Sequence, residues 1–508
     1  MDSSKIKLLL IVVVAVFASL YLGISAATAQ FEAIAWVIGG LTLCICLLLG
    51  RSIWVLLPLL TAVNLQLRIP GSPSTLLAAQ IIVLGFSFLL VASRKLSISI
   101  RLTELEFWMC GLAILVIQVY ARNPAGVWIF QSDTVGGKAY FIIAITFVTA
   151  IYLCSIVAEE KDLKRILPLV VFGSIINVTV AIIGKFVPIL GYYTGAKFSI
   201  NESIVGSTIG DGRATRFLEV SIFGQSLALW ISCLKNPLKV AFDPRWLFLI
   251  LLSVACALFG GYRSGFAMVI MTYIVGTWYR GGFAATFAGA FAGCCGIALL
   301  AIANVIVPLP PNIQRSLTIL PGTWEQRYRD DADGSTEWRA EIWKEVLFTD
   351  RWIQNKIIGD GLGFTKQQLD YQLSLTEAQS TRRGISGFEM QRESILASGD
   401  YHSGPVSTIR VIGYVGLVFV ILFQIRLAVH AHMQIIRCRG TEWYPLALLI
   451  GIPLICAPVY FHFIFGDFRS EAITLFMGSA MIRLLERGLP LPANSLRRHP
   501  KVSPLRAG

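Results

Sequence analysis

The feature that most constrains the fold is a series of long apolar runs, each close to 20 residues, that recurs along most of the chain. A helix needs about 20 apolar residues to cross the roughly 30 Å hydrocarbon core of a bilayer. Hydrophobic residues make up 55% of the chain and charged residues only 14%, whereas soluble domains carry about 25% charged residues. A transmembrane β-barrel would show short alternating strands instead. The sequence therefore predicts an all-α, polytopic integral membrane protein.

The apolar runs predict about 14 transmembrane helices, joined by short loops except for one large polar segment. Two of them, 52–67 and 246–260, are short for a bilayer-spanning helix. The expected spans are 7–28, 32–50, 52–67, 75–93, 105–121, 138–157, 166–190, 214–233, 246–260, 262–279, 283–307, 405–429, 443–464 and 468–486.

Lysine and arginine are enriched in alternate loops, which is the pattern of cytoplasmic loops in membrane proteins. We therefore expect both termini in the cytoplasm and the polar segment on the outer side. The formal net charge of +13 reflects this bias better than a nucleic-acid-binding surface, since it is spread over short loops. The expected parts are a transmembrane bundle of about 11 helices (1–307), a large outer loop (308–404), about three C-terminal transmembrane helices (405–488) and a basic tail (489–508) that we expect to be disordered.

The outer loop is nearly a hundred residues long and slightly acidic, so it is too polar to enter the bilayer. Loops of this length are usually functional or disordered. A helical pattern at Ser335–Phe348 and the glycine-rich turn GDGLGF favour an ordered cap. The acidic run Asp330–Gly334 lacks the spacing of an EF-hand, and we interpret it as a solvated turn and not a metal site.

Arginines and a histidine gather where several predicted spans begin on the outer side. Arg213 and Arg216 open one span, and Arg263 opens another. His402 precedes a third span, in which Arg410 lies about two turns deeper. Ionisable groups at membrane depth are functional candidates by default, although an arginine near a helix end can instead extend to the lipid headgroups.

This combination of residue types fits a particular chemistry. Arginine matches phosphate oxygens with a planar fork of donors and keeps its charge. A departing diphosphate needs such charge compensation. Histidine titrates near neutral pH and can accept a proton from an attacking hydroxyl. Arginines beside one histidine therefore suit group transfer from a lipid diphosphate to an alcohol.

Three motifs resemble those of the O-antigen ligase family, which includes O-antigen and exopolysaccharide polymerases. His402-Ser403 is followed, after nine intervening residues, by Gly413-Tyr414-Val415-Gly416, which resembles the family's histidine motif. The run Trp338–Phe364 resembles the family's outer-loop pattern, with Arg339 and Trp343 followed by Gly359, Gly361 and Gly363. Arg263 and Arg213 resemble arginines of two upstream spans. The chain departs from the family at Arg213-Ala-Thr-Arg216, where members often have R-x-x-G followed by Pro-Asn.

The resemblance implies an inverting, metal-independent glycosyltransferase of the GT-C type, without a cofactor, in the bacterial inner (cytoplasmic) membrane. The donor would be a glycan on undecaprenyl diphosphate, and the transfer would occur at the periplasmic face. The acceptor would be a sugar of the lipid A core for a ligase, or another glycan chain for a polymerase. The partners would be these substrates and membrane lipids, with no nucleic acid.

The resemblance also implies roles for single residues. His402 and Arg263 are the catalytic candidates, with His402 as the base that activates the acceptor hydroxyl. The diphosphate would be held by Arg263 with Arg213, Arg216 and Arg410. Glycan contacts would come from the outer loop, through Trp338, Arg339, Trp343, Gly359, Gly361 and Gly363. Ser403, Gly413 and Gly416 complete the histidine motif, and we expect the two glycines to allow close helix packing.

Two other classes of protein remain possible on the sequence alone. A lipid-linked glycan flippase would have charged residues along its whole pathway and a repeated architecture, whereas the unusual charges here gather at outer ends. A polymer-binding or assembly protein without catalysis would have no need of His402. Transfer is the favoured interpretation and the flippase is the alternative.

Overall fold

The computed structural model describes most of the chain and divides it into two compact units. The smaller unit has residues 1–54 and 85–96, and the larger has residues 55–84 and 97–508, which include every candidate site residue. The described residues are 42–67, 72–124, 136–187, 216–318, 322–364 and 401–489, with single positions or pairs at 40, 191, 194, 198–199, 320, 370, 374, 396 and 399.

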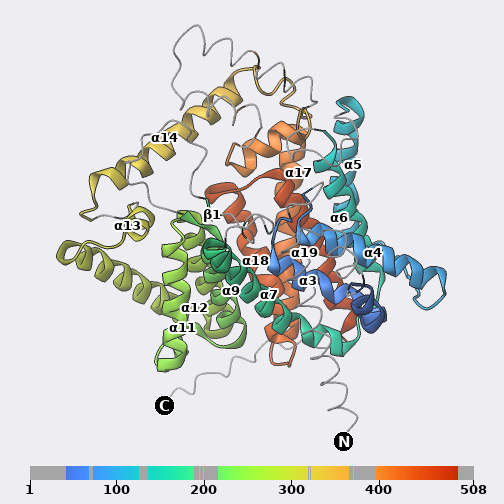
Figure 1. Ribbon diagram of the computed structural model, residues 1–508, viewed down its shortest axis with the longest axis horizontal. Coiled ribbons are helices and arrows are strands. Elements are labelled where there is room, and N and C mark those ends of the chain that lie inside the picture. The colour runs from blue at the N-terminus through green and yellow to red at the C-terminus, as the bar shows by residue number, and fades with distance from the viewer. Residues whose placement is uncertain are drawn as a thin grey trace, which may run out of the picture. The chain divides into compact units, whose positions relative to one another are not determined.

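The described part of the chain is almost entirely helical (Figure 1). Its elements are η1 (Gly50–Val55), α3 (Leu56–Val63), α4 (Thr75–Ala92), α5 (Glu104–Arg122), α6 (Lys138–Ser155), α7 (Glu160–Phe186), β1 (Phe198–Ser199), β2 (Arg216–Phe217), α9 (Leu218–Leu234), α10 (Pro237–Val240), α11 (Pro244–Phe259), α12 (Arg263–Ile306), α13 (Pro311–Leu317), α14 (Gln326–Phe348), α17 (Gly404–Cys438), α18 (Tyr444–Val459), η2 (Tyr460–Ile464) and α19 (Phe468–Gly488). The two short strands pair antiparallel with each other.

Eight of the described helical segments are long and apolar enough to cross a membrane, which confirms the expected polytopic, helical architecture. They are Thr42–Val63, Thr75–Ala92, Glu104–Arg122, Lys138–Ser155, Glu160–Phe186, Arg263–Ile306, Gly404–Cys438 and Tyr444–Ile464. The total of 14 spans and their orientation stay predictions. The expected span 7–28 and nearly all of the tail lie outside the described residues.

Glycines with a positive φ lie at two of the expected boundaries between spans. The runs 32–50 and 52–67 meet at Gly50, whose φ is 52°; the described residues there give one candidate span, Thr42–Val63, and the division into two spans stays a prediction. The runs 262–279 and 283–307 lie in α12, which is interrupted at Gly282 with a φ of 74°. Glycine adopts a positive φ without a steric penalty, so the break falls where the sequence places the boundary.

Helix ends follow local sequence signals. Thr103 and Glu106 form a reciprocal capping box at the start of α5, in which the Thr103 N–H donates to the Glu106 carboxylate at 3.0 Å. The side chain of Asp243 accepts a hydrogen bond from the backbone N–H of Arg245 at the start of α11. Helices α11, α13 and α17 each have a proline near the first position. A proline there costs no helical hydrogen bond, because the first N–H groups of a helix have no acceptor within it.

Within the larger unit, α17 is the central element and packs against α5, α18 and α19. The polar segment after α12 forms α13 and α14, and the helix expected at Ser335–Phe348 is the second half of α14. That half packs on the start of α17 through buried apolar side chains, which include Ile342, Val346, Tyr401 and Ile409. The packing holds this part of the polar segment against the end of α17 that follows His402.

Candidate functional site

His402 lies directly before α17 in an unusual backbone conformation. Its φ is 50°, in the left-handed region that side-chain-bearing residues seldom adopt. Ser403 then returns to an extended conformation and Gly404-Pro405 begins the helix. The half-buried imidazole lies between Trp338 of α14, with ring centroids 6.1 Å apart, and Phe465, at 5.7 Å. Backbone strain of this kind is concentrated at functional sites.

α14 is fixed to the His402 turn by a hydrogen bond as well as by apolar packing. The indole Nε1 of Trp343 donates to the backbone carbonyl of Tyr401 at 2.9 Å. Tyr401 is itself almost completely buried, and this burial raises the pKa of its hydroxyl. Trp343 therefore has a structural partner in the protein, while Trp338 faces the imidazole. Of the two tryptophans expected to contact glycan, Trp338 is the better placed beside the histidine.

α17 is interrupted at Gly413, whose φ is 73°. A glycine-rich segment of the outer loop, which we call the glycine loop (residues 356–363), pairs with the backbone groups that this break releases. Four hydrogen bonds replace the helical ones: the N–H groups of Asp360 and Gly361 donate to the carbonyls of Arg410 (2.7 Å) and Val411 (3.1 Å), and those of Tyr414 and Val415 donate to the carbonyls of Lys356 (2.8 Å) and Ile357 (3.2 Å).

Glycines on both sides of this pairing allow the backbones to approach. A Cβ atom on Gly413 would lie 2.1 Å from the carbonyl oxygen of Ile357, and one on Gly359 would lie 2.3 Å from that of Val411. A Cβ on Gly361 would lie 2.4 Å from the hydroxyl of Tyr140. The expectation that Gly413 allows close packing between helices is therefore wrong, because its close neighbour is the glycine loop.

The other side of the glycine loop is held by α5 and α6. Arg122 at the end of α5 donates to the carbonyls of Ile358 and Gly359, both at 2.9 Å. The hydroxyl of Tyr140 accepts a hydrogen bond from the Leu362 N–H at 2.8 Å. The two motifs that are about 50 residues apart in sequence, the glycine turn and the histidine motif, thus form one structure around the start of α17.

Arg410, two turns along the chain from His402, is buried and does not lie at an open surface. Its guanidinium lies 4.6 Å from the ring centroid of Phe364 and 5.8 Å from that of Tyr401, which are cation–π distances. A Cβ atom added to Gly399 would overlap the guanidinium, so the chain fits closely around it. These contacts suit a residue that positions the His402 turn better than one that binds a diphosphate.

A second group of arginines lies at the start of α12. Arg263 is the first residue of the helix and is half-buried. Arg315 of α13 is buried, and its guanidinium donates to the carbonyl of Gly261 at 2.7 Å, two residues before Arg263. Arg339 of α14 is close enough to Arg315 for the like charges to repel. Its pKa is lowered mainly by burial and, to a smaller extent, by this repulsion. Three segments therefore contribute cationic side chains here.

The contacts of η2 link this group to the histidine. Ser264, next to Arg263, hydrogen-bonds with Tyr460. The following residue, Phe461, packs against Gly404, where an added Cβ would lie 2.5 Å from the Phe461 carbonyl oxygen. Arg263 and His402 therefore lie on two helix starts that are both packed against η2.

The structure places the remaining predicted residues as follows. Arg213 lies outside the described residues, and for Arg216 only the backbone, in β2, is described. Ser403 is buried at the start of α17, and an added Cβ on Gly416 would meet the Ile412 side chain. Gly363 has a φ of 69° and ends the glycine loop.

Sequence reasoning did not identify Arg315, Arg122 or Tyr140. Arg315 lies in a short proline-initiated helix, two residues after Ile313 and two before Leu317, a signal that a buried arginine was possible there. The other two residues carry no sequence signal, because their roles depend on a loop more than 200 residues away.

Among the described residues, no group of three or more potential metal ligands lies together. No family model matches the chain, and no curated protein matches it.

Proposed function

We propose that this chain is a membrane glycosyltransferase that moves a glycan from undecaprenyl diphosphate to an acceptor hydroxyl at the periplasmic face. It would act as an O-antigen ligase or as an O-antigen or exopolysaccharide polymerase, the class that its motifs resemble. The observation that carries the proposal is the placement of His402. Its imidazole stands at a strained helix start beside Trp338, and arginines lie at the neighbouring start of α12.

The proposed reaction assigns the proton and the charge to different residues. The acceptor hydroxyl oxygen attacks the anomeric carbon of the donor while His402 takes the hydroxyl proton. The bond between that carbon and the diphosphate oxygen breaks, and the diphosphate leaves with the bonding electrons. Attack from the opposite side inverts the anomeric configuration. Arg263 and Arg315 compensate the growing negative charge, because donors fixed before the reaction need no reorganisation.

Arg339 and Trp338 of α14 are proposed to contact the glycan. The Nε atom of Arg339 is buried and has no hydrogen-bond partner among the described residues, so it can donate to a bound oxygen without losing a protein contact. Trp338 presents an aromatic ring beside His402. These two residues would orient the acceptor hydroxyl toward the imidazole, which contributes to rate through positioning.

A flippase for lipid-linked glycans is the second candidate, and one observation favours it. Three polar side chains form a hydrogen-bonded chain inside the bundle: Gln424 donates to Glu471 at 2.7 Å and its oxygen pairs with His462 Nε2 at 2.8 Å. Polar groups at membrane depth often mark a transport pathway. Transfer remains the favoured function, because the hydrogen bonds among Gln424, Glu471 and His462 do not explain the strained turn at His402.

The proposal is tested in a bacterial strain that lacks the gene and is complemented with variants at matched membrane abundance. His402→Ala and Arg263→Ala are compared with wild type, His432→Ala and Arg327→Ala. His432 lies toward the opposite end of α17, and the exposed Arg327 forms an ion pair with Glu325 across 2.7 Å and stacks on the ring of Tyr328. Surface glycan is resolved by size, and lipid-linked intermediates are quantified on each leaflet.

The expected result is loss of mature glycan with accumulation of lipid-linked glycan on the outer leaflet in the two site variants alone. The missing product then distinguishes a ligase from a polymerase. Accumulation on the inner leaflet would instead identify a flippase. Wild-type behaviour of both site variants would refute the assignment of His402 and Arg263.

A further inference from the structure

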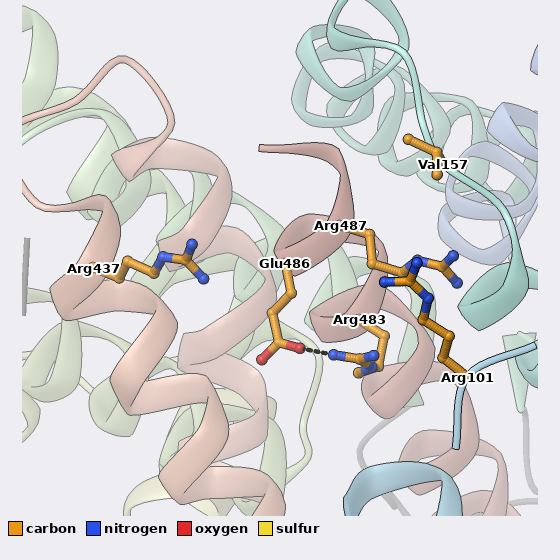
Figure 2. Close-up of a pocket in the computed structure, with 6 residues that line it drawn as sticks. All are labelled: Arg101, Val157, Arg437, Arg483, Glu486 and Arg487. Atoms are coloured by element: carbon orange, nitrogen blue, oxygen red, sulfur yellow. Dashed lines mark hydrogen bonds and ion pairs between the residues drawn. The ribbon is translucent and has the colours of Figure 1, made fainter. Parts of the chain in front are cut away.

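A cavity of about 630 Å³ lies at the opposite end of α17 from His402 and is lined mainly by arginines. Figure 2 shows its lining side chains, which come from the ends of α17 and α19 and from the loops before α5 and after α6. They are Arg101, Val157, Arg437, Arg483, Glu486 and Arg487. Four arginines against one glutamate give the cavity a strong positive charge.

The nearby carboxylates do not neutralise this charge. Arg483 uses both of them, since it pairs with Glu486 and, at 3.0 Å, with Glu106. Glu486 also accepts a hydrogen bond from Gln434 at 2.8 Å, so its oxygens are already used. Arg483 is therefore a structural residue of the wall, and the remaining arginines determine what the cavity attracts.

Arg487 and Arg101 are the cationic groups with capacity for a ligand. Among the residues that the structure describes, Arg487 donates only to backbone carbonyls, those of Ser99 (3.2 Å) and Cys154. Arg101 is exposed and makes no hydrogen bond or ion pair with the described residues. The two guanidinium groups are close enough to repel each other, which an anion between them would relieve.

Exposed apolar residues line the cavity or lie beside its lining residues in the chain. Val157, which lines it, is 67% exposed. On either side of Arg101, Ile100 and Leu102 are exposed by 66% and 59%, and Ile98 by 43%. The segment is held to the end of α6 by a hydrogen bond from the Ser99 N–H to the Ser155 carbonyl at 3.0 Å. A fixed cationic cavity with exposed apolar residues next to it in the chain matches an amphiphile with an anionic head.

We propose that this cavity is a binding site for a phosphate group held by Arg101 and Arg487. Guanidinium groups bind phosphate oxygens through paired hydrogen bonds. The phosphate could belong to an anionic lipid or to a soluble phosphate compound, and the exposed apolar residues at Val157 and beside Arg101 favour the lipid. Basic pockets at the ends of transmembrane helices are known to bind anionic headgroups. The site is independent of the proposed transfer reaction.

The test uses the purified full-length protein in neutral detergent. Thermal unfolding is measured as phosphatidylglycerol, phosphatidylcholine, inorganic phosphate or glycerol 3-phosphate is added, and bound lipid is quantified by native mass spectrometry. Arg101→Gln is the main variant, because it removes a charge without removing a described protein contact. Arg487→Lys keeps the charge and removes the fork, and the exposed Arg245→Gln, outside the cavity, is the control.

We expect phosphatidylglycerol to stabilise wild type and Arg245→Gln more than phosphatidylcholine does. The affinity should fall about fivefold in Arg101→Gln, which corresponds to about 1 kcal/mol for one charge near the surface. Equal stabilisation by inorganic phosphate or glycerol 3-phosphate, lost in the same variant, would support the phosphate site and identify a soluble ligand. If no phosphate compound distinguishes Arg101→Gln from Arg245→Gln, the proposal is wrong.

Discussion

The backbone N–H of Asp360 donates to the carbonyl of Arg410 at 2.7 Å, an oxygen that α17 does not use because the helix is broken at Gly413. The pairing joins the glycine loop to a helix that begins about 40 residues later. It also fixes the backbone of α17 about two turns beyond His402. Docking of the glycine loop therefore supports the helix that begins at the strained turn.

Gly413→Ala should detach the glycine loop. An alanine pays about 1–2 kcal/mol for a left-handed φ, and at Gly413 its Cβ also overlaps the Ile357 carbonyl. Gly440→Ala is the matched control, because Gly440 has a φ of 82° but open space around its Cβ position. We expect Gly413→Ala to lower the free energy of unfolding by about 1–3 kcal/mol more than the control. Thermal unfolding and limited proteolysis of the outer segment measure this, and equal losses would contradict it.

Particular elements show which parts of this structure the sequence could predict. The apolar runs predicted most helices, since spanning length and hydrophobicity are local properties, and α4 and α6 begin at the expected residues. The Gly282 break was predictable for the same reason. The docking of Gly359 on α17 was not, because a glycine signals conformational freedom without naming its partner. Arg315 of α13 was missed because its role depends on its contact with the residues just before α12. The sequence pattern does not show that these two segments are in contact.

Arg315→Gln should reduce the rate of the proposed transfer reaction with little change in the abundance of the protein in the membrane. The substitution removes a buried charge beside Arg263 and weakens the hydrogen bond to the Gly261 carbonyl. Loss of one preorganised electrostatic donor costs about 100-fold or more in rate. The measurement is glycan transfer in membranes that contain lipid-linked donor, with Arg327→Gln as the exposed control. A rate within about twofold of the control would remove Arg315 from the site.

Trp343→Phe and Trp338→Phe should affect different properties. Trp343→Phe leaves the buried Tyr401 carbonyl without its donor, so the free energy of unfolding should fall by about 1–3 kcal/mol. Trp338→Phe keeps an aromatic ring beside His402 and should change that free energy by no more than about 0.5 kcal/mol. Thermal unfolding of both variants in detergent is the measurement. If Trp338→Phe proved the more destabilising, the division of roles between the two tryptophans would be wrong.

The buried ion pair between Arg483 and Glu106 provides a stability prediction that does not depend on function. The two side chains are 13% and 3% exposed and lie 3.0 Å apart. Arg483→Met leaves Glu106 charged and buried, which should lower the free energy of unfolding by about 3–5 kcal/mol. Glu106→Gln keeps a residue type that serves the capping box with Thr103, so it tests the charge separately.

A double-mutant cycle measures the coupling between the two residues. We expect Arg483→Met and Glu106→Gln together to cost less than the sum of the single changes, by about 1–3 kcal/mol. The exposed pair Arg327–Glu325, at 2.7 Å, is the matched control and should show a coupling of about 1 kcal/mol or less, since water screens both charges. Equal coupling in the two cycles would mean that burial adds nothing to the Arg483–Glu106 pair, and that α5 and α19 are held together by apolar packing alone.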